Sequence, residues 1–190
     1  MPASELLCAV LLSAWLLLAA VSDIRTRRIP NVVVLAGMLS GLALQAFAPA
    51  GQGLFAYGWG GLGLGSALLG LLAGLGLFMP LYLLRAVGAG DVKLLAMVGV
   101  WLGPQLLLGS TLLTLLAGGV LALATMFARR SARSVLANVR LMMTTAMVGA
   151  HAGKVAPFDP SMTSGVRMPY AVAIAAGTLA HVGWLLFHAA

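Results

Sequence analysis

Residues 106–128 read LLLGSTLLTLLAGGVLALATMFA, a run of 23 residues without a charged side chain. A helix that spans the hydrocarbon core of a bilayer needs roughly 20 predominantly apolar residues, so this run is long enough to cross a membrane. Further apolar runs that predict spans lie at residues 6–22, 32–48, 59–84, 91–103 and 169–188. The sequence therefore predicts an all-α integral membrane protein, a bundle of about six transmembrane helices in one polytopic domain, residues 1–190.

The composition of the whole chain agrees with a membrane protein. Of its 190 residues, 62% are hydrophobic and 8% are charged, whereas about a quarter of the residues in a soluble domain are charged. Lys and Arg total 11 against four acids, which gives a net charge of +7. Because these basic residues lie between apolar runs, they are typical of membrane topology signals, and no nucleic-acid partner is expected.

The basic residues occur only in alternate loops. The first loop contains three arginines, the third contains Arg85 and Lys93, and the fifth, residues 129–167, contains the other six basic residues. The positive-inside rule places these loops in the cytoplasm and both chain termini on the other side. In the fifth loop we expect a basic amphipathic segment on the anionic inner leaflet, with a solvated cytoplasmic loop as the alternative.

Asp23 and Asp91 lie where apolar runs meet the cytoplasmic boundary, so the topology predicts both at the same depth. Ionisable groups at such positions are costly and are functional candidates. Each also has a structural explanation, because Asp91 can cap the following helix and Asp23 can pair with the arginines after it. Together they describe a pair of carboxylates, and Gly88 and Gly90 beside one of them leave room for a substrate backbone.

The chemistry of two carboxylates that share a site is specific, because one keeps a proton while the other is charged. The charged group can take a proton from a water that attacks a peptide carbonyl, and the protonated group can polarise that carbonyl. No metal or other cofactor is expected, because His151, His181 and His188 follow no ligand spacing. Cys8 lies within an apolar run with no base in sequence reach, which disfavours a thiol nucleophile.

Three segments resemble a known family. Gly88-Ala89-Gly90-Asp91 is similar to the GxGD signature of intramembrane aspartyl proteases, in the form found in prepilin peptidases, also called type IV leader peptidases. The segment from Asp23 to Asn31 resembles that family's first aspartate motif, an Asp followed by basic residues and Ile-Pro-Asn. Pro169-Tyr170-Ala171 is similar to its late Pro-Tyr/Phe-Gly segment, with Ala171 at the usual glycine, a change that we expect to loosen local packing.

The resemblance implies that Asp23 and Asp91 are the catalytic pair of a membrane aspartyl endopeptidase. It also implies residues that support the site or hold the first loop at the interface: Gly88, Gly90, Lys93, Arg25, Arg27, Arg28, Pro30, Asn31, Pro169 and Tyr170. Lys93 could instead be a topology charge, and Tyr170 an interfacial anchor. The implied substrates are prepilins or pseudopilins, cut between leader and hydrophobic helix at the cytoplasmic face of the bacterial inner membrane.

Longer members of that family carry an extra cytoplasmic domain with paired CxxC motifs and also methylate the new N-terminus. This sequence contains one cysteine and has no room for that domain between its first two apolar runs. It resembles the short, peptidase-only form associated with tight-adherence (Flp-type) pilus systems, so we expect no N-methyltransferase activity.

Two other functions are compatible with the pattern. A small ion- or proton-coupled transporter could bind a cation at the same aspartates, but it needs a continuous polar path, and few polar residues lie in the middle of any run. A non-catalytic subunit of a pilus or secretion assembly could share the fold, although it would not need both aspartates. The glycines of residues 61–74 allow close contacts within the bundle or between copies, which leaves the oligomeric state open.

Overall fold

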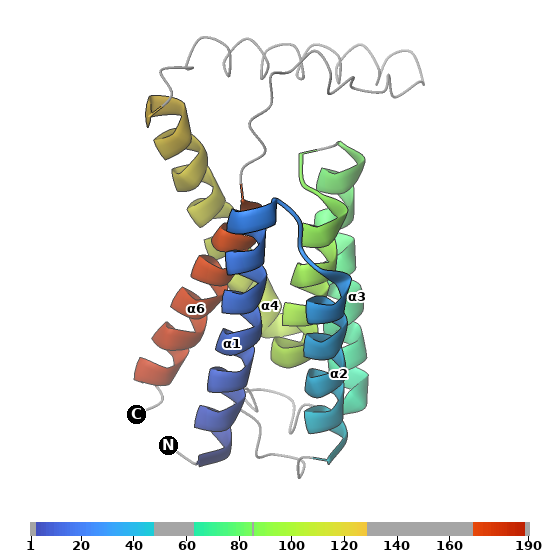
Figure 1. The fold of residues 1–190 in the computed structure, drawn as a ribbon. Helices are drawn as coiled ribbons and strands as arrows, with labels where there is room; N and C mark the ends of the chain where they lie inside the picture. Colours follow the sequence, from blue (N-terminus) through green and yellow to red (C-terminus); the bar gives the residue numbers. More distant parts are fainter. Residues whose placement is uncertain (1–2, 48–62, 85, 129–168, 189–190) are drawn as a thin grey trace. The chain divides into compact units, whose positions relative to one another are not determined.

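The computed structural model describes residues 3–47, 63–84, 86–128 and 169–188. Every regular element in these ranges is an α-helix (Figure 1). The helices are α1 (Ala3–Thr26), α2 (Asn31–Phe47), α3 (Leu64–Leu83), α4 (Ala89–Ala128) and α6 (Tyr170–His188).

The chain divides into two compact units. One unit combines Met1–Gly118 with Pro169–Ala190, and the other is Gly119–Met168. The first unit holds all the described helices except the last part of α4, and the site lies within it. In this unit α1 packs against α6 and α2, and α2 packs against α3. The start of α1 and the end of α6 lie at the same end of the unit (Figure 1).

Four of the described helices, α1, α3, α4 and α6, are long and apolar enough to cross a membrane, and α2 is a shorter apolar helix of 17 residues. The prediction of an all-helical protein with membrane-spanning helices is therefore confirmed for the described residues. The count of about six spans and the outward orientation of both termini stay predictions. The basic segment at residues 129–167 lies outside the described residues, as does the start of the run expected at 59–84.

The 40 residues of α4 contain a break at the position that separates two predicted runs. Gly103 has φ 72° and ψ 173°, and Pro104 follows it. Glycine adopts a positive φ at low cost, and a proline that begins a new helical segment loses no hydrogen bond there. The segments on either side of Gly103 therefore correspond to the runs expected at 91–103 and 106–128.

The end of α1 differs from the expected boundary. The apolar run ends at residue 22, but the helix continues to Thr26, so Asp23 lies within the last turns of the helix and not in the loop. In this last turn the Thr26 hydroxyl lies 2.9 Å from the Ser22 carbonyl oxygen. The helix ends where the Arg27 N–H donates to the Asp23 carbonyl at 2.9 Å, with Arg27 at a positive φ of 54°.

Glycines allow α3 and α4 to approach each other closely. Gly70 of α3 lies against the backbone of Gly99, and Gly74 lies against the backbone of Ala96, where an added Cβ would stand 2.7 Å from the Ala96 Cα. The expectation that the glycine-rich run packs inside the bundle is confirmed at these two positions. It is not confirmed at Gly65, where an added Cβ would meet open space.

We expect Gly70→Ala to destabilise the protein, because the added methyl group would overlap the Gly99 carbonyl and force two helix backbones apart. The free energy of unfolding should fall by about 1–3 kcal/mol. Thermal unfolding of the protein in detergent micelles, followed by circular dichroism, measures the change. Gly65→Ala is the matched control, and its midpoint of thermal unfolding should be equal to or above that of the wild type. Equal destabilisation by both variants would contradict the packing described.

Candidate active site

The two predicted aspartates lie at helix ends in the first unit. Asp23 is in the last turns of α1 and is 7% exposed, and Asp91 is in the first turn of α4 and is 9% exposed. Their carboxylates are close enough to interact electrostatically. Carboxylates are seldom buried this far unless hydrogen bonds satisfy them. The structure thus brings together the pair that the sequence predicts.

The Asp91 carboxylate is held by the turn that begins α4. The Gly88 N–H donates to Asp91 Oδ2 at 2.9 Å, and the Asp91 N–H donates back to the Gly88 carbonyl at 3.1 Å. The Asp91 side chain, at the third helical residue, thus satisfies the free N–H of the cap residue Gly88, which is one half of a capping box, and the second bond is a backbone turn. The capping role that the sequence suggests for Asp91 is therefore present. It uses one carboxylate oxygen, Oδ2.

The Asp23 carboxylate is held by a different helix. The Ala171 N–H donates to Asp23 Oδ2 at 3.1 Å in a buried hydrogen bond that links α6 to α1. The first N–H groups of a helix have no partner within the helix, and Ala171 is the second residue of α6. The motif predicts a segment near the site but does not predict this donor. The Ala171 side chain is fully buried, so its methyl group is accommodated in the packing.

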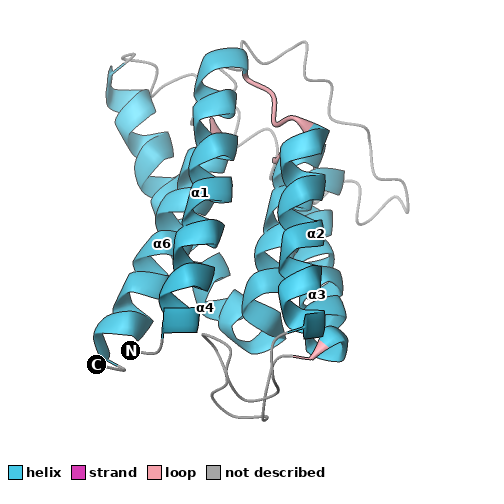
Figure 2. Cartoon of the chain, turned by 60° about the horizontal axis from the view of Figure 1, so that its bottom comes forward, coloured by secondary structure: helices cyan, strands magenta, loops and turns pink. Residues whose placement is uncertain are grey.

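The connection between α1 and α2 is drawn in pink in Figure 2, and through Ile29 it contacts the start of α4. The Lys93 ammonium donates to Asn31 Oδ1 at 3.2 Å. An added Cβ at Gly90 would stand 3.3 Å from Ile29 Cβ, so the Ile29 side chain lies directly over Gly90. Lys93, Asn31 and Gly90 were each predicted as supporting residues, and these contacts tie the first aspartate's loop to the second aspartate's helix.

Hydroxyl groups shape this same connection. The Ser22 hydroxyl donates to the Arg28 carbonyl at 3.2 Å, and the Thr26 hydroxyl shares its one proton between this carbonyl, at 3.1 Å, and that of Ser22. The motif does not predict these two roles, although the pairing of Ser and Thr four residues apart at a helix end is a signal that could have indicated them. The Pro30 carbonyl accepts the Val33 N–H at 3.1 Å as α2 begins.

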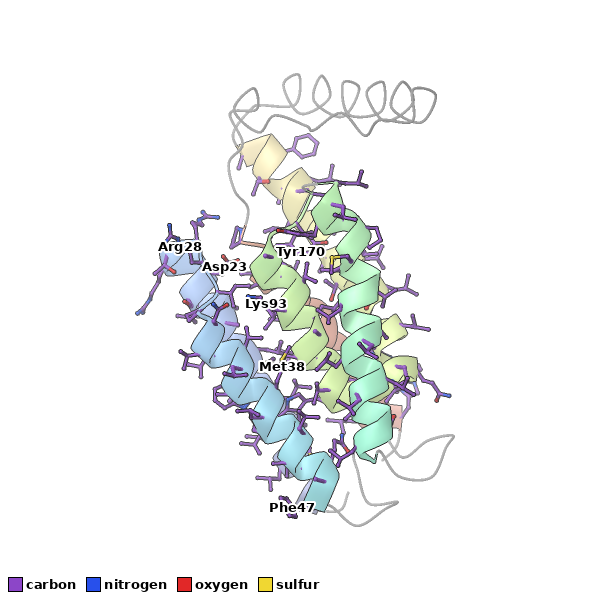
Figure 3. All side chains as sticks on the ribbon, turned by 90° about the vertical axis from the view of Figure 1, so that its right-hand side faces the viewer. Asp23, Arg28, Met38, Phe47, Lys93 and Tyr170 are labelled. Atoms are coloured by element: carbon purple, nitrogen blue, oxygen red, sulfur yellow. The ribbon has the colours of Figure 1, made fainter. Side chains whose placement is uncertain are left out.

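The remaining predicted residues lie around this end of the unit. Figure 3 shows Asp23, Arg28, Lys93 and Tyr170 toward one end, with Phe47 at the other. Arg25 and Arg28 are exposed, which suits contact with solvent or lipid headgroups. Their predicted role in holding the loop at the interface stays a prediction.

Tyr170 joins three helices beside the pair of carboxylates. Its ring centroid is 6.0 Å from that of Phe78 in α3, and an added Cβ at Gly118 of α4 would stand 2.8 Å from its hydroxyl oxygen. Tyr170 also lies within electrostatic reach of Asp91. Pro169 directly precedes it, and the Pro169 carbonyl accepts the Val172 N–H at 3.1 Å in the first turn of α6. Both residues therefore lie near the aspartates, as the motif predicts.

The apolar helices indicate a multi-pass membrane protein, and two buried aspartates lie at the ends of its helices. Residues 10–123 match the sequence model of the type IV leader peptidase family, and these residues include both aspartates. The chain belongs to this family.

A relative with a curated description supports the same assignment. The prepilin leader peptidase/N-methyltransferase of Pectobacterium carotovorum subsp. carotovorum is 32% identical over an alignment of 133 positions that covers 65% of this chain. The chain spans 43% of the length of that relative. No solved structure matches the chain.

The contact between Ile29 and Gly90 can be tested by a double-mutant cycle. Gly90→Val should lower the free energy of unfolding by about 1–3 kcal/mol, because its side chain would occupy the space of Ile29. Adding Ile29→Ala should recover part of that loss, and thermal unfolding in detergent measures each variant. Gly76→Val places the same side chain in open space on α3 and is the control. Strictly additive effects of the two substitutions would contradict the contact.

Proposed function

We propose that the protein is an aspartyl endopeptidase that cleaves the leader peptide of a prepilin or pseudopilin. Membership of the type IV leader peptidase family supports a leader peptidase. The observation that supports the aspartyl mechanism most directly is the burial of Asp23 and Asp91 within electrostatic reach of each other. Two carboxylates that share a desolvated site hold one proton between them, which supplies an acid and a base together.

In the proposed reaction the charged carboxylate accepts a proton from a bound water, and the water oxygen bonds to the carbonyl carbon of the scissile peptide. The protonated carboxyl group donates to the carbonyl oxygen. The carbon–nitrogen bond then breaks, and the leaving nitrogen takes up a proton from the pair. The backbone bonds to Oδ2 of each aspartate hold the carboxylates in place, and we assign the reaction to the opposite oxygens, Oδ1. No metal or other cofactor takes part in this mechanism.

The position of the pair suits a substrate with a hydrophobic helix. Asp23 lies in the last turns of one apolar helix and Asp91 in the first turn of another, so the pair lies near the end of the apolar unit. A substrate helix beside this unit would bring its own boundary with the leader to the same depth. We infer that the cleaved bond lies at that boundary. The arginines of the first loop support a site on the cytoplasmic side of the bacterial inner membrane, beside anionic lipids.

We also propose one membrane peptidase domain over residues 1–190, and the family match over residues 10–123 supports it for that part of the chain. In this arrangement about six spans carry the site, both termini face away from the cytoplasm, and residues 129–167 form the basic cytoplasmic segment.

The first test is cleavage of candidate prepilins by the purified protein in liposomes that contain anionic lipid. Asp23→Asn and Asp91→Asn should each lower kcat by about 100-fold or more, because each removes one of the two proton-transfer groups. Glu5→Gln is the matched control and should cleave like the wild type, and thermal unfolding checks that all variants are folded. Activity in both aspartate variants would overturn the mechanism. Failure of the wild type to cleave any prepilin in the panel would favour the transporter or assembly-subunit alternatives.

We further propose that the protein does not methylate its product. Only four residues, Arg27 to Pro30, connect α1 to α2, and the chain contains one cysteine, so it holds no paired CxxC motif. Incubation of the protein with a prepilin that it cleaves and with S-adenosylmethionine should give a mature pilin of unmodified mass. Mass spectrometry measures the mass of the product. A bifunctional prepilin leader peptidase/N-methyltransferase is the positive control. A mass increase of one methyl group would contradict this proposal.

A further inference from the structure

In the first unit α4 packs closely against α6, the helix whose first turn contacts Asp23. We call this α4–α6 contact the seam. We define this seam by Gly109, Ser110, Thr114 and Gly118 of α4 with Tyr170, Gly177 and His181 of α6. An added Cβ at Gly109 would stand 2.6 Å from the His181 ring, and one at Gly118 would stand 2.8 Å from the Tyr170 hydroxyl oxygen. Gly177 lies against the backbone of Thr114. The two helices therefore run antiparallel at close range over roughly two and a half turns of α4.

One hydrogen bond between side chains crosses this seam. The Ser110 hydroxyl and His181 Nδ1 are 2.8 Å apart, with Ser110 fully buried. The hydroxyls of Thr114 and of Thr178, the residue after Gly177, are also buried but have no hydrogen-bond partner. In the described part of the seam, Ser110 and His181 therefore form the hydrogen bond between side chains. Between apolar helices in a bilayer, packing and such hydrogen bonds supply the association.

The glycine contacts in the seam bring the two helices close and seat the His181 and Tyr170 side chains against α4. The hydrogen bond of 2.8 Å adds a directional restraint on the position of α6 along α4, because the interaction weakens steeply as its distance and angle change. Gly109 leaves the space that the imidazole ring occupies. The pair is therefore placed to determine the axial register of α6.

The register of α6 matters because its first turn holds Asp23. His181 lies ten residues after Ala171 in the same helix, so about 15 Å of helix connects the two positions. A shift of α6 along its axis moves the Ala171 N–H by the same amount. The bond from Ala171 to Asp23 Oδ2 is 3.1 Å long, near the upper end of the usual range, so a slip of about 1 Å would break it.

We propose that Ser110 and His181 are positioning residues for the reaction. They set the register of α6 and so keep the Ala171 N–H on the Asp23 carboxylate. Neither residue touches the aspartates, and neither belongs to the motifs that indicate the site. This inference rests on the proposed peptidase function for its kinetic test, but its structural part can be measured without activity.

The kinetic test compares His181→Leu and Ser110→Ala with the wild type on a cleaved prepilin in liposomes. Each should lower kcat by about 10- to 100-fold with KM within about twofold, because a misplaced reacting group costs rate while the substrate still binds. His181→Asn should restore most of the rate, because its side-chain amide reaches the position of Nδ1. The double variant should be no slower than the slower single variant, as expected for one shared interaction.

His188→Leu is the matched control for loss of a histidine from α6. His188 Nδ1 contacts the Trp184 carbonyl of its own helix at 2.8 Å, so its loss should leave kcat unchanged. The structural readout is hydrogen exchange of the Ala171 amide, observed by NMR on protein labelled with 15N-alanine. Exchange should be faster in Ser110→Ala and His181→Leu than in the wild type and in His181→Asn.

The outcomes separate the two proposals. If the wild type cleaves no prepilin but the Ala171 amide still loses protection in both seam variants, the register role stands and the peptidase function fails. Unchanged kcat in Ser110→Ala and His181→Leu would overturn the positioning role, as would a rise in KM with constant kcat. Failure of His181→Asn to restore rate and protection would also overturn it. If His181→Leu does not fold, Ser110→Ala alone decides the question, because it removes one oxygen from the seam.

Discussion

A carboxylate buried among apolar helices is stable only where hydrogen-bond donors reach it, and this constraint organises the protein. Both aspartates take their donors from the backbone at the start of a helix. The Gly88 N–H donates to Asp91, and the Ala171 N–H donates to Asp23. The first N–H groups of a helix have no internal partner, so the carboxylate and the helix end satisfy each other. The bond to Asp23 requires the end of α1 to lie beside the start of α6, and the contact of Ile29 with Gly90 brings the start of α4 to the same place.

The remaining contacts of the first unit keep these three helix ends together. The connection after α1 contacts α4 through Ile29, which lies over Gly90. Asn31, at the start of α2, accepts a hydrogen bond from Lys93 of α4. Further from the site, the Trp101 indole donates to the Gly37 carbonyl at 2.9 Å and links α4 to α2. Since α4 contacts α2, α3 and α6 by glycine packing or hydrogen bonds, the position of Asp91 is coupled to these three helices. A site of this kind is preorganised by packing and not by the length of its loops.

Much of this arrangement could be predicted from the sequence. The parts that could not be predicted have one physical reason in common. Apolar run lengths predict the helices, and the Gly103-Pro104 break divides α4 as expected. The alternation of basic loops predicts a common depth for the two aspartates, which the structure brings together. The donor to Asp23, the hydroxyl bonds to the Arg28 carbonyl and the pairing of Ser110 with His181 are not predicted. Each of these joins groups whose proximity depends on how helices pack, which no local pattern encodes.

The donor to Asp23 shows why a comparison of side chains alone describes this site incompletely. The family match covers residues 10–123 and includes both aspartates, but Ala171 lies beyond it. Its contribution is a backbone N–H, which every residue except proline can supply. Alanine at a position where the resembling motif usually has glycine therefore preserves the hydrogen bond, and its methyl group is fully buried. At this position the protein must keep the start of α6 beside Asp23. The residues that keep it there can lie several turns away, on the seam between α4 and α6.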